Sequence, residues 1–298
     1  MLCFEQIMCR VVDVMPAVAQ PALEPPAPFV RWVGGKTAIL PMLLAHVPKK
    51  FGVYYEPFVG GGALFFALAA QRPGLRAVIS DANLRLVRTY RGVRDAVETV
   101  IAGLEECTRL HTKDFYYQMR DIDIDAVPDD ADVAACFLYL NRTCFNGLYR
   151  VNADGKMNTP IGKTSSGAPP VICQAERLRA CSAALQSVEI EHGDALEVAN
   201  RAKPGDFIYA DPPYIPLSKT SDFTSYTAEK FGPDEQEALR NLAVNLKAGG
   251  VHVLLSNSSA PEVAELYGRY FKLEPVTRRG TVSSKIRARG AVTEMLIY

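Results

Sequence analysis

The sequence predicts an α/β protein whose sheet is interrupted by a helical insertion. A strand-like run at 53–59 is followed by three glycines, by the helical stretch ALFFALAAQ, and by a second strand-like run that ends at Asp81. Strand, glycine turn, helix, strand and terminal acid are the layout of a nucleotide-binding βαβ unit. Helical periodicity then dominates from residue 83 to about residue 140, and strand-like runs return after residue 187.

The later elements follow from local patterns. The polar stretch 141–162 is punctuated by glycine, and Asp154-Gly155 has the chemistry of a hairpin turn. Helices are expected at about 173–186 and at 233–247. The remaining strand-like runs are VEIEHGD (188–194), DFIYA (206–210), GGVHVLLSN (249–257), FKLEPV (271–276) and TEMLIY (293–298).

Composition is that of an ordinary globular protein, with 48% hydrophobic and 22% charged residues. No run of 18 or more residues is apolar, so no membrane span is expected. Residues 1–28 do not resemble a secretory signal, because Glu5, Arg10 and Asp13 interrupt any apolar core, and their Pro/Ala-rich end suggests a flexible lead-in. Together with seven scattered cysteines that form no C-x-x-C pair, this favours a cytoplasmic protein with reduced thiols. The four histidines form no ligand motif, and no metal site is predicted.

Formal net charge is zero, but charge is unevenly distributed. Residues 121–132 carry six aspartates, which we interpret as a solvated acidic loop. Residues 278–290 carry five basic groups and no acid. A basic segment rich in Gly and Ser is a candidate for phosphate contacts, with Arg287 as the expected contact.

The most informative stretch is Asp211-Pro212-Pro213-Tyr214, at the end of a predicted strand. Asp-Pro favours turns and proline ends a ladder, so these residues alone are also compatible with a plain strand-terminating turn. The carboxyl ends of strands are where ligands bind in open α/β sheets, and both this turn and the glycine turn are expected at that edge.

Longer stretches of the sequence distinguish a plain turn from a functional one. The chain resembles the DNA adenine-N6 methyltransferases of the Dam type (the D12 class), most closely the branch that includes the DpnM methylase. The resemblance covers the chain from about residue 29 to its end. It is carried, in the family's order, by RWVGGK (31–36), YYEPFVGGGALFF (54–66), SDAN (80–83), FNGLYRVN (145–152), NTPIG (158–162), GDFIYADPPYIPLS (205–218), FTSYT (223–227) and LLSNSS (254–259).

This resemblance implies a Rossmann-like, S-adenosylmethionine-dependent methyltransferase sheet. It also implies an inserted helical target-recognition domain that carries a β-hairpin. The expected domains are a lead-in at 1–28, a discontinuous catalytic domain at 29–85 and 188–298, and a target-recognition domain at 86–187, with the hairpin at about 143–160.

For the Asp-Pro-Pro-Tyr turn, the resemblance implies catalysis at an exocyclic amine, which is a poor nucleophile because its lone pair is delocalised into the ring. Asp211 can accept one amine hydrogen and the Pro212 carbonyl another, while the rings of Pro212 and Pro213 keep the turn rigid. The nitrogen lone pair can then point at a sulfonium methyl. Tyr214 supplies a stacking face for a base lifted out of the duplex.

The implied methyl donor is S-adenosylmethionine, and the product is S-adenosylhomocysteine. Gly60 and Gly62 let the backbone approach the cofactor, and Asp81 is expected to accept the ribose hydroxyls. Asp194 is expected either to help hold the adenine or to cap a helix. The full expected cofactor set is Trp32, Gly34, Lys36, Glu56, Phe58, Gly60, Gly62, Asp81, Asp194 and Asp211.

The implied partner is double-stranded DNA containing GATC, with a cognate restriction endonuclease as a possible second partner. Phe145 is expected to wedge into the base stack, Asn146 and Leu148 to meet base edges, and Arg150 to bind a guanine through O6 and N7. Arg31 corresponds to a basic residue that contacts the outer guanine. The full expected DNA-contacting set is Arg31, Arg142, Phe145, Asn146, Leu148, Arg150, Asn158, Pro160 and Arg287.

Other functions remain open at this point. Methylation of cytosine N4 uses similar chemistry, although those enzymes usually carry Ser where this chain has Asp211. Methylation of cytosine C5 needs a nucleophilic cysteine, typically after proline, and no Pro-Cys pair occurs. A non-catalytic DNA-binding module of the same fold would not need the intact turn, and a dinucleotide oxidoreductase would leave it unexplained.

Overall fold

The computed structural model describes residues 24–163, 168–216, 231–279 and 291–298. The chain divides into two compact units. Of the described residues, the sheet unit comprises Gly35–Leu68, Arg72–Ala82 and those from Ser187 to Tyr298, and the helical unit comprises those up to Gly34, Ala69–Gln71 and those from Asn83 to Gln186. The predicted α/β class is confirmed.

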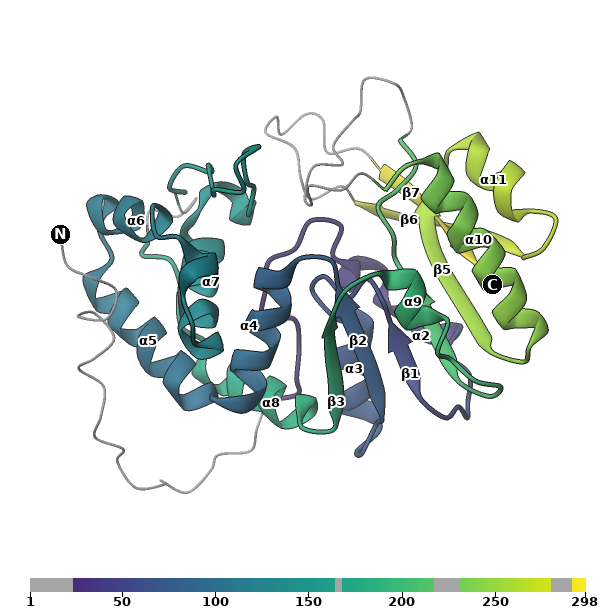
Figure 1. Ribbon diagram of the computed structural model, residues 1–298, viewed down its shortest axis with the longest axis horizontal. Coiled ribbons are helices and arrows are strands. Elements are labelled where there is room, and N and C mark those ends of the chain that lie inside the picture. Colours follow the sequence, from purple (N-terminus) through teal and green to yellow (C-terminus); the bar gives the residue numbers. More distant parts are fainter. Residues whose placement is uncertain (1–23, 164–167, 217–230, 280–290) are drawn as a thin grey trace. The chain divides into compact units, whose positions relative to one another are not determined.

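The sheet unit contains, in the described residues, a seven-stranded sheet with the order β3-β2-β1-β4-β5-β7-β6 (Figure 1). The first five strands are parallel, and β7 pairs antiparallel with both β5 and β6. The strands are β1 (Tyr54–Glu56), β2 (Ala77–Asp81), β3 (Val188–His192), β4 (Phe207–Ala210), β5 (His252–Ser258), β6 (Leu273–Arg279) and β7 (Ala291–Ile297). The helices that accompany them are the 3-10 helix η1 (Lys36–Ile39), α2 (Leu40–Ala45), α3 (Ala63–Gln71), α9 (Ala195–Ala199), α10 (Pro233–Ala248) and α11 (Pro261–Tyr267).

The first strand is shorter than the predicted run 53–59. The ladder of β1 ends at Glu56, and Pro57 follows, which has no N–H to donate to a neighbour. In contrast, β6 is longer than predicted and extends to Arg279, so the first two residues of the basic stretch 278–290 belong to a strand rather than to a loop.

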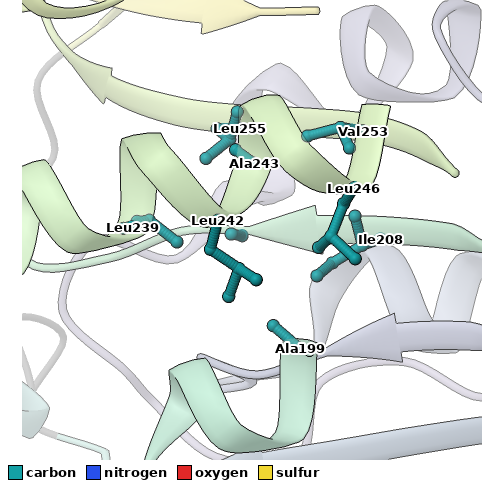
Figure 2. A pocket seen from close by; sticks show the side chains of 9 residues that line it. Ala199, Ile208, Leu239, Leu242, Ala243, Leu246, Val253 and Leu255 are labelled. Carbon is teal, nitrogen blue, oxygen red and sulfur yellow. The ribbon is translucent and has the colours of Figure 1, made fainter. Parts of the chain in front are cut away.

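Both faces of the central strands are buried. Tyr55, Val78 and Ile208 form an apolar cluster with Val198, Ala199, Leu246 and Val251, so this face packs against α9 and α10. Figure 2 shows the side chains of α10 directed toward β4, β5 and Ala199 of α9. The cavity left between them is about 10 Å³, which is room for no more than one water. This space is therefore core packing and not a ligand site.

The helical unit follows β2 and precedes β3 in the chain. Its elements are α4 (Leu84–Asp95), α5 (Val97–Leu110), α6 (Lys113–Arg120), η2 (Ile124–Ala126), α7 (Asp130–Thr143), η3 (Phe145–Gly147) and α8 (Ala175–Leu185). Helix α7 is apolar on most of its circumference and packs against α4, α5 and α6. Such a helix must be surrounded, which makes α7 the centre of this unit.

The helical unit also includes residues that we expected in the catalytic domain. Phe29 packs edge-on against Tyr90 with ring centroids 5.0 Å apart, and the Cys181 thiol lies 3.1 Å from the Ala27 carbonyl. At the other boundary, Asn83 caps α4 by accepting the N–H of Leu86 (3.2 Å). The expected boundary at residues 29 and 85 therefore differs from the observed one, because these short segments bond to the helices that follow them.

We predict that Asp206 is a main tie between the amino ends of β1 and β4. Its buried carboxylate accepts the N–H groups of Val53 (2.7 Å) and Lys203 (2.8 Å). Asp206→Ala leaves both donors without this partner, so urea unfolding should show a loss of about 1–3 kcal/mol. The control Glu237→Ala removes an exposed carboxylate and should change stability by less than about 0.5 kcal/mol. Equal stability of the two variants would contradict this role.

Candidate active site

The Asp-Pro-Pro-Tyr turn leaves the carboxyl end of buried β4, next to β1 at the centre of the sheet. Ligands of open α/β sheets bind at the carboxyl ends of two neighbouring strands from which the chain continues toward opposite sides of the sheet. In this sheet β1 and β4 are those two strands. The turn is held in place by side chains. Gln236 Nε2 donates to the Pro213 carbonyl (2.7 Å), while Asn257 Oδ1 accepts the Ile215 N–H (3.1 Å). The predicted turn is thus a rigid feature of the sheet edge.

An ion pair fixes the orientation of Asp211. Lys36 Nζ, at the start of η1, lies 2.6 Å from Asp211 Oδ2, and only 18% of the Asp211 side chain is exposed. Within the described residues, the other oxygen, Oδ1, is buried and has no hydrogen-bond partner. Burial raises the pKa of Asp211, and the Lys36 ammonium opposes that shift. The site thus offers one oriented acceptor atom for a donor that none of the described residues supplies.

A carboxylate that the sequence analysis did not select lies beside this pair. Glu294 on β7 is 1% exposed and accepts a hydrogen bond from the Tyr214 hydroxyl (2.8 Å). Its Oε2 is 3.9 Å from Lys36 Nζ, and Lys36 Nζ lies 4.9 Å from the centroid of the Tyr214 ring. Burial, followed by the nearby carboxylates of Asp211 and Glu294, raises the pKa of Tyr214 well above its ordinary value. Tyr214 therefore stays a neutral donor.

Glu56, predicted as a cofactor residue, is the last residue of β1 and is fully buried. Its Oε2 accepts the Tyr54 hydroxyl (2.8 Å) and the Phe65 N–H (3.1 Å). Burial raises the pKa of Glu56 to about 8, and the Asp211 charge adds to the effect. Glu56 and Asp211 therefore interact electrostatically at one edge of the sheet.

The glycine turn follows β1 and leads into α3. Gly60 (φ 47°) and Gly62 (φ 65°) adopt the left-handed conformation, which explains why glycine is needed at both positions. The Gly60 N–H donates to Asp81 Oδ2 (3.1 Å) at the end of β2. The structure thus brings two predicted cofactor elements, the glycine turn and the acid, into direct contact.

The other predicted cofactor residues are Trp32, Gly34, Phe58 and Asp194. Trp32 is half-buried, and Gly34 is exposed with a φ of 80°. Phe58 is half-buried, and its ring packs edge-on against Phe231 at 5.5 Å. Asp194 caps α9 by accepting the Leu196 N–H (2.6 Å), which is the helix-capping alternative. A contact of any of these residues with a cofactor stays a prediction.

The predicted hairpin of the helical unit is present as two antiparallel bridges, Cys144 with Ile161 and Val151 with Met157. Arg150 and Asn158 are both exposed, and Arg150 Nε donates to Asn158 Oδ1 (2.8 Å). These two predicted DNA-contacting residues therefore lie side by side.

The turn before the hairpin holds the other predicted residues. Phe145 is 45% exposed, and Asn146 is exposed with a φ of 56°. Leu148 is half-buried, and the Pro160 carbonyl accepts the Phe145 N–H (2.9 Å). The Phe145 ring therefore does more than pack on helices, because nearly half of it is exposed. Asn146 has a positive φ, which is uncommon for a residue other than glycine.

The two remaining arginines differ in exposure. Arg31 is exposed, whereas Arg142 is half-buried and donates to the Phe29 carbonyl (2.7 Å). Burial lowers the pKa of Arg142 to about 10, and the neighbouring cation Arg31 adds to this shift. Arg142 thus has a structural role in the segment before residue 32, and its DNA contact stays a prediction.

Asn141 is a second residue that the sequence analysis did not select. Its fully buried side chain accepts the Arg31 N–H (2.8 Å) and donates to the Arg31 carbonyl (2.8 Å) and to the Gly147 carbonyl (3.4 Å). Arg31 and the hairpin turn are therefore joined through one amide.

Two of the predictions concern residues that the structure does not describe. Arg287 and the stretch FTSYT lie outside the described residues. In the part of the chain that is described, no group of three His, Cys, Asp or Glu side chains could hold a metal ion. No described helix is long and apolar enough to cross a membrane.

Comparisons with known proteins show the family of this chain. The family model for the D12 class N6 adenine-specific DNA methyltransferases matches residues 32–282. The chain is 40% identical over 275 residues to the Type II methyltransferase M1.LlaDCHI of Lactococcus lactis subsp. cremoris, covering 91% of this chain and 94% of that protein. It is 36% identical over 286 residues to the Type II methyltransferase M.MjaIII of Methanocaldococcus jannaschii (91% and 98%), and 32% identical over 270 residues to the DNA adenine methylase of Salmonella typhi (90% and 93%).

The chain therefore belongs to the D12 class N6 adenine-specific DNA methyltransferases. The resemblance to the Dam type that the motifs indicated is confirmed. The sheet edge described above is the candidate catalytic centre of an adenine methyltransferase.

We predict that Glu56 makes stability depend on pH. Its pKa is raised to about 8 in the folded chain. Glu56 therefore keeps its proton in the folded chain at pH values where the unfolded chain has already released it, above the ordinary pKa of a glutamate. Stability from this group is therefore greatest at low pH and is lost as pH rises toward 8. Urea unfolding of the wild type and of Glu56→Gln at pH values between about 5 and 8 should show a flatter profile for the variant. Parallel profiles would contradict a protonated Glu56.

Proposed function

We propose that this protein transfers the methyl group of S-adenosylmethionine to N6 of adenine in double-stranded GATC sites, with the target base turned out of the duplex. The observation that carries the proposal is the buried, oriented Oδ1 of Asp211, which has no hydrogen-bond partner among the residues that the structure describes. A buried carboxylate oxygen without a donor is costly, and an amine hydrogen of the target base would satisfy it.

The chemistry at Asp211 needs little reorganisation. The Lys36 ion pair keeps Oδ2 occupied, and the Gln236 contact to Pro213 holds the turn. Asp211 Oδ1 and the Pro212 carbonyl would accept the two hydrogens of N6 and draw its lone pair out of conjugation. Because both acceptors are fixed before the base arrives, they favour the transition state over the free amine.

The residues of the sheet edge also fit the proposed cofactor. When bound, S-adenosylmethionine supplies an electrophilic methyl group on a sulfonium sulfur. Gly60 and Gly62 leave the backbone without side chains at the carboxyl end of β1, and Asp81 holds the Gly60 N–H. Asp81 would accept the ribose hydroxyls, and Lys36, Glu56 and Phe58 would line the remainder of the site. No metal is part of the proposal.

Target recognition is assigned to the helical unit and its hairpin. Phe145 and Asn146 are exposed at the turn, where an apolar ring could enter the base stack. Arg150 is exposed beside Asn158, so a planar guanidinium and an amide are available together for base edges in the major groove. GATC is the site that the resemblance of the motifs to the Dam type implies, and a relative named DNA adenine methylase agrees with adenine as the target base. A restriction endonuclease of the same specificity is a possible partner, in line with the Type II methyltransferases among the relatives.

The reaction is tested by incubating the purified protein with labelled S-adenosylmethionine and unmethylated DNA, followed by nucleoside analysis. We expect the label in N6-methyladenine, and we expect the DNA to resist an endonuclease that methylated GATC blocks. DNA in which every GATC has been altered is the control and should stay unlabelled. Label in N4-methylcytosine, or no transfer, would refute the proposed reaction.

One prediction of the proposed function concerns Asp211, the amine acceptor. Asp211→Ala should lower the rate of methyl transfer by a factor on the order of 100 or more, because the lost contact acts chiefly in the transition state. Binding of GATC duplex, measured by fluorescence anisotropy, should change little. Asp234→Asn, which neutralises an exposed acid on the first turn of α10, is the matched control and should keep full activity. Near-normal turnover in Asp211→Ala would remove the turn from the mechanism.

A second prediction concerns specificity. If Arg150 contacts a guanine through two hydrogen bonds, Arg150→Ala should lose about 1–3 kcal/mol of discrimination at one base pair. The measurement is a panel of methylation rates over all single-base variants of GATC. Lys156→Ala, an exposed cation on the same hairpin, should weaken all sites evenly or not at all. Uniform weakening by Arg150→Ala would make this arginine a phosphate contact instead.

A further inference from the structure

Glu294 is a buried carboxylate on β7, the last of the described strands in chain order. The antiparallel pairing of β7 with β5 puts Glu294 opposite Ser258, at the end of β5 where the parallel strands have their carboxyl termini. The strand β7 runs antiparallel to β5 and its pairing with β5 begins at Glu294, so this acid lies at the same edge as Asp211. The register of β7 therefore explains how a residue so far along the chain reaches the candidate active site.

Glu294 contacts both groups that flank Asp211. It accepts the Tyr214 hydroxyl at 2.8 Å, and its Oε2 lies 3.9 Å from Lys36 Nζ. The same ammonium lies 2.6 Å from Asp211 Oδ2 and 4.9 Å from the centroid of the Tyr214 ring. One carboxylate thus links the ring of the turn to the counter-ion of the proposed amine acceptor.

The energetics favour a positioning role over a role in stability. Burying a carboxylate is costly, and an apolar residue of similar size would often serve stability as well. Tyr214 needs no hydrogen bond to supply a stacking face, but an aromatic ring with a free hydroxyl could adopt other rotamers. A hydrogen bond to a rigid strand limits these rotamers before a ligand arrives.

We propose that Glu294 is a positioning residue of the methyltransferase site, which holds the Tyr214 ring and the Lys36 ammonium in the arrangement that the target base requires. This inference rests on the proposed function, because the base is the group that Tyr214 would stack against. Glu294 itself does not touch the reacting atoms.

The experiment compares Glu294→Leu, Glu294→Gln, Tyr214→Phe and the double variant Glu294→Leu with Tyr214→Phe. Single-turnover methyl transfer to a GATC duplex gives the rate. A duplex with 2-aminopurine in place of the target adenine gives a fluorescence signal for the extruded base. The matched control is Tyr298→Phe, which removes a hydroxyl that donates to exposed Glu274 on β6 (3.1 Å) from the residue directly after β7.

Glu294→Leu and Tyr214→Phe should each slow transfer about 10-fold, as expected for the loss of one charge-assisted hydrogen bond. The double variant should be no slower than the slower single variant, since Glu294→Leu already removes the contact that Tyr214→Phe removes. Glu294→Gln should restore most of the rate, because its amide oxygen can still accept the Tyr214 hydroxyl. The 2-aminopurine signal should change with the rate, and Tyr298→Phe should leave both unchanged.

Three outcomes would overturn the inference. They are an unchanged rate and base signal in Tyr214→Phe, additive losses in the double variant, and equal losses in Tyr298→Phe. If Glu294→Leu does not fold, Tyr214→Phe and Glu294→Gln still decide the question. Failure of the proposed function is a separate result, since it would appear as inactivity of the wild type on the same duplex.

Discussion

The ion pair between Lys36 and Asp211 is the interaction on which the candidate site depends. A buried carboxylate with no counter-ion would take up a proton, and a protonated acid is a poor acceptor of amine hydrogens. Lys36 opposes that uptake and occupies one oxygen, so the other oxygen faces the site as an acceptor. The contacts of Gln236 and Asn257 with the turn then keep this acceptor in place.

The mixed sheet brings the charged groups of this site together. The parallel strands β1 and β4 end side by side and deliver Glu56 and Asp211, while the antiparallel β7 adds Glu294 from the opposite direction. Three carboxylates at one edge, those of Glu56 and Glu294 buried and that of Asp211 18% exposed, would repel each other strongly. The Lys36 ammonium, the raised pKa of Glu56 and the Tyr214 hydroxyl each reduce that repulsion.

Local chemistry explains which parts of this arrangement could be predicted from the sequence. The glycine turn, Asp81 and the Asp-Pro-Pro-Tyr turn are encoded by adjacent residues, and so is the hairpin around Asp154-Gly155. Glu294 and Asn141 could not be found in that way, because Tyr214 lies 80 positions from Glu294 and Arg31 lies 110 positions from Asn141. An acid or amide inside an otherwise apolar strand or helix was the available signal. The structural role of Arg142 likewise depends on a distant carbonyl, that of Phe29.

The most direct test of this account is the pH dependence of single-turnover methyl transfer by the wild type and by Lys36→Met, at saturating S-adenosylmethionine and GATC duplex, from about pH 5 to about pH 9. Removal of the ammonium raises the pKa of Asp211 further, so the rise in rate should move to higher pH in the variant. The plateau rate at high pH should fall less than the rate near neutrality. A profile that keeps the position of the wild-type rise would contradict the claim that Lys36 maintains an ionised acceptor at Asp211.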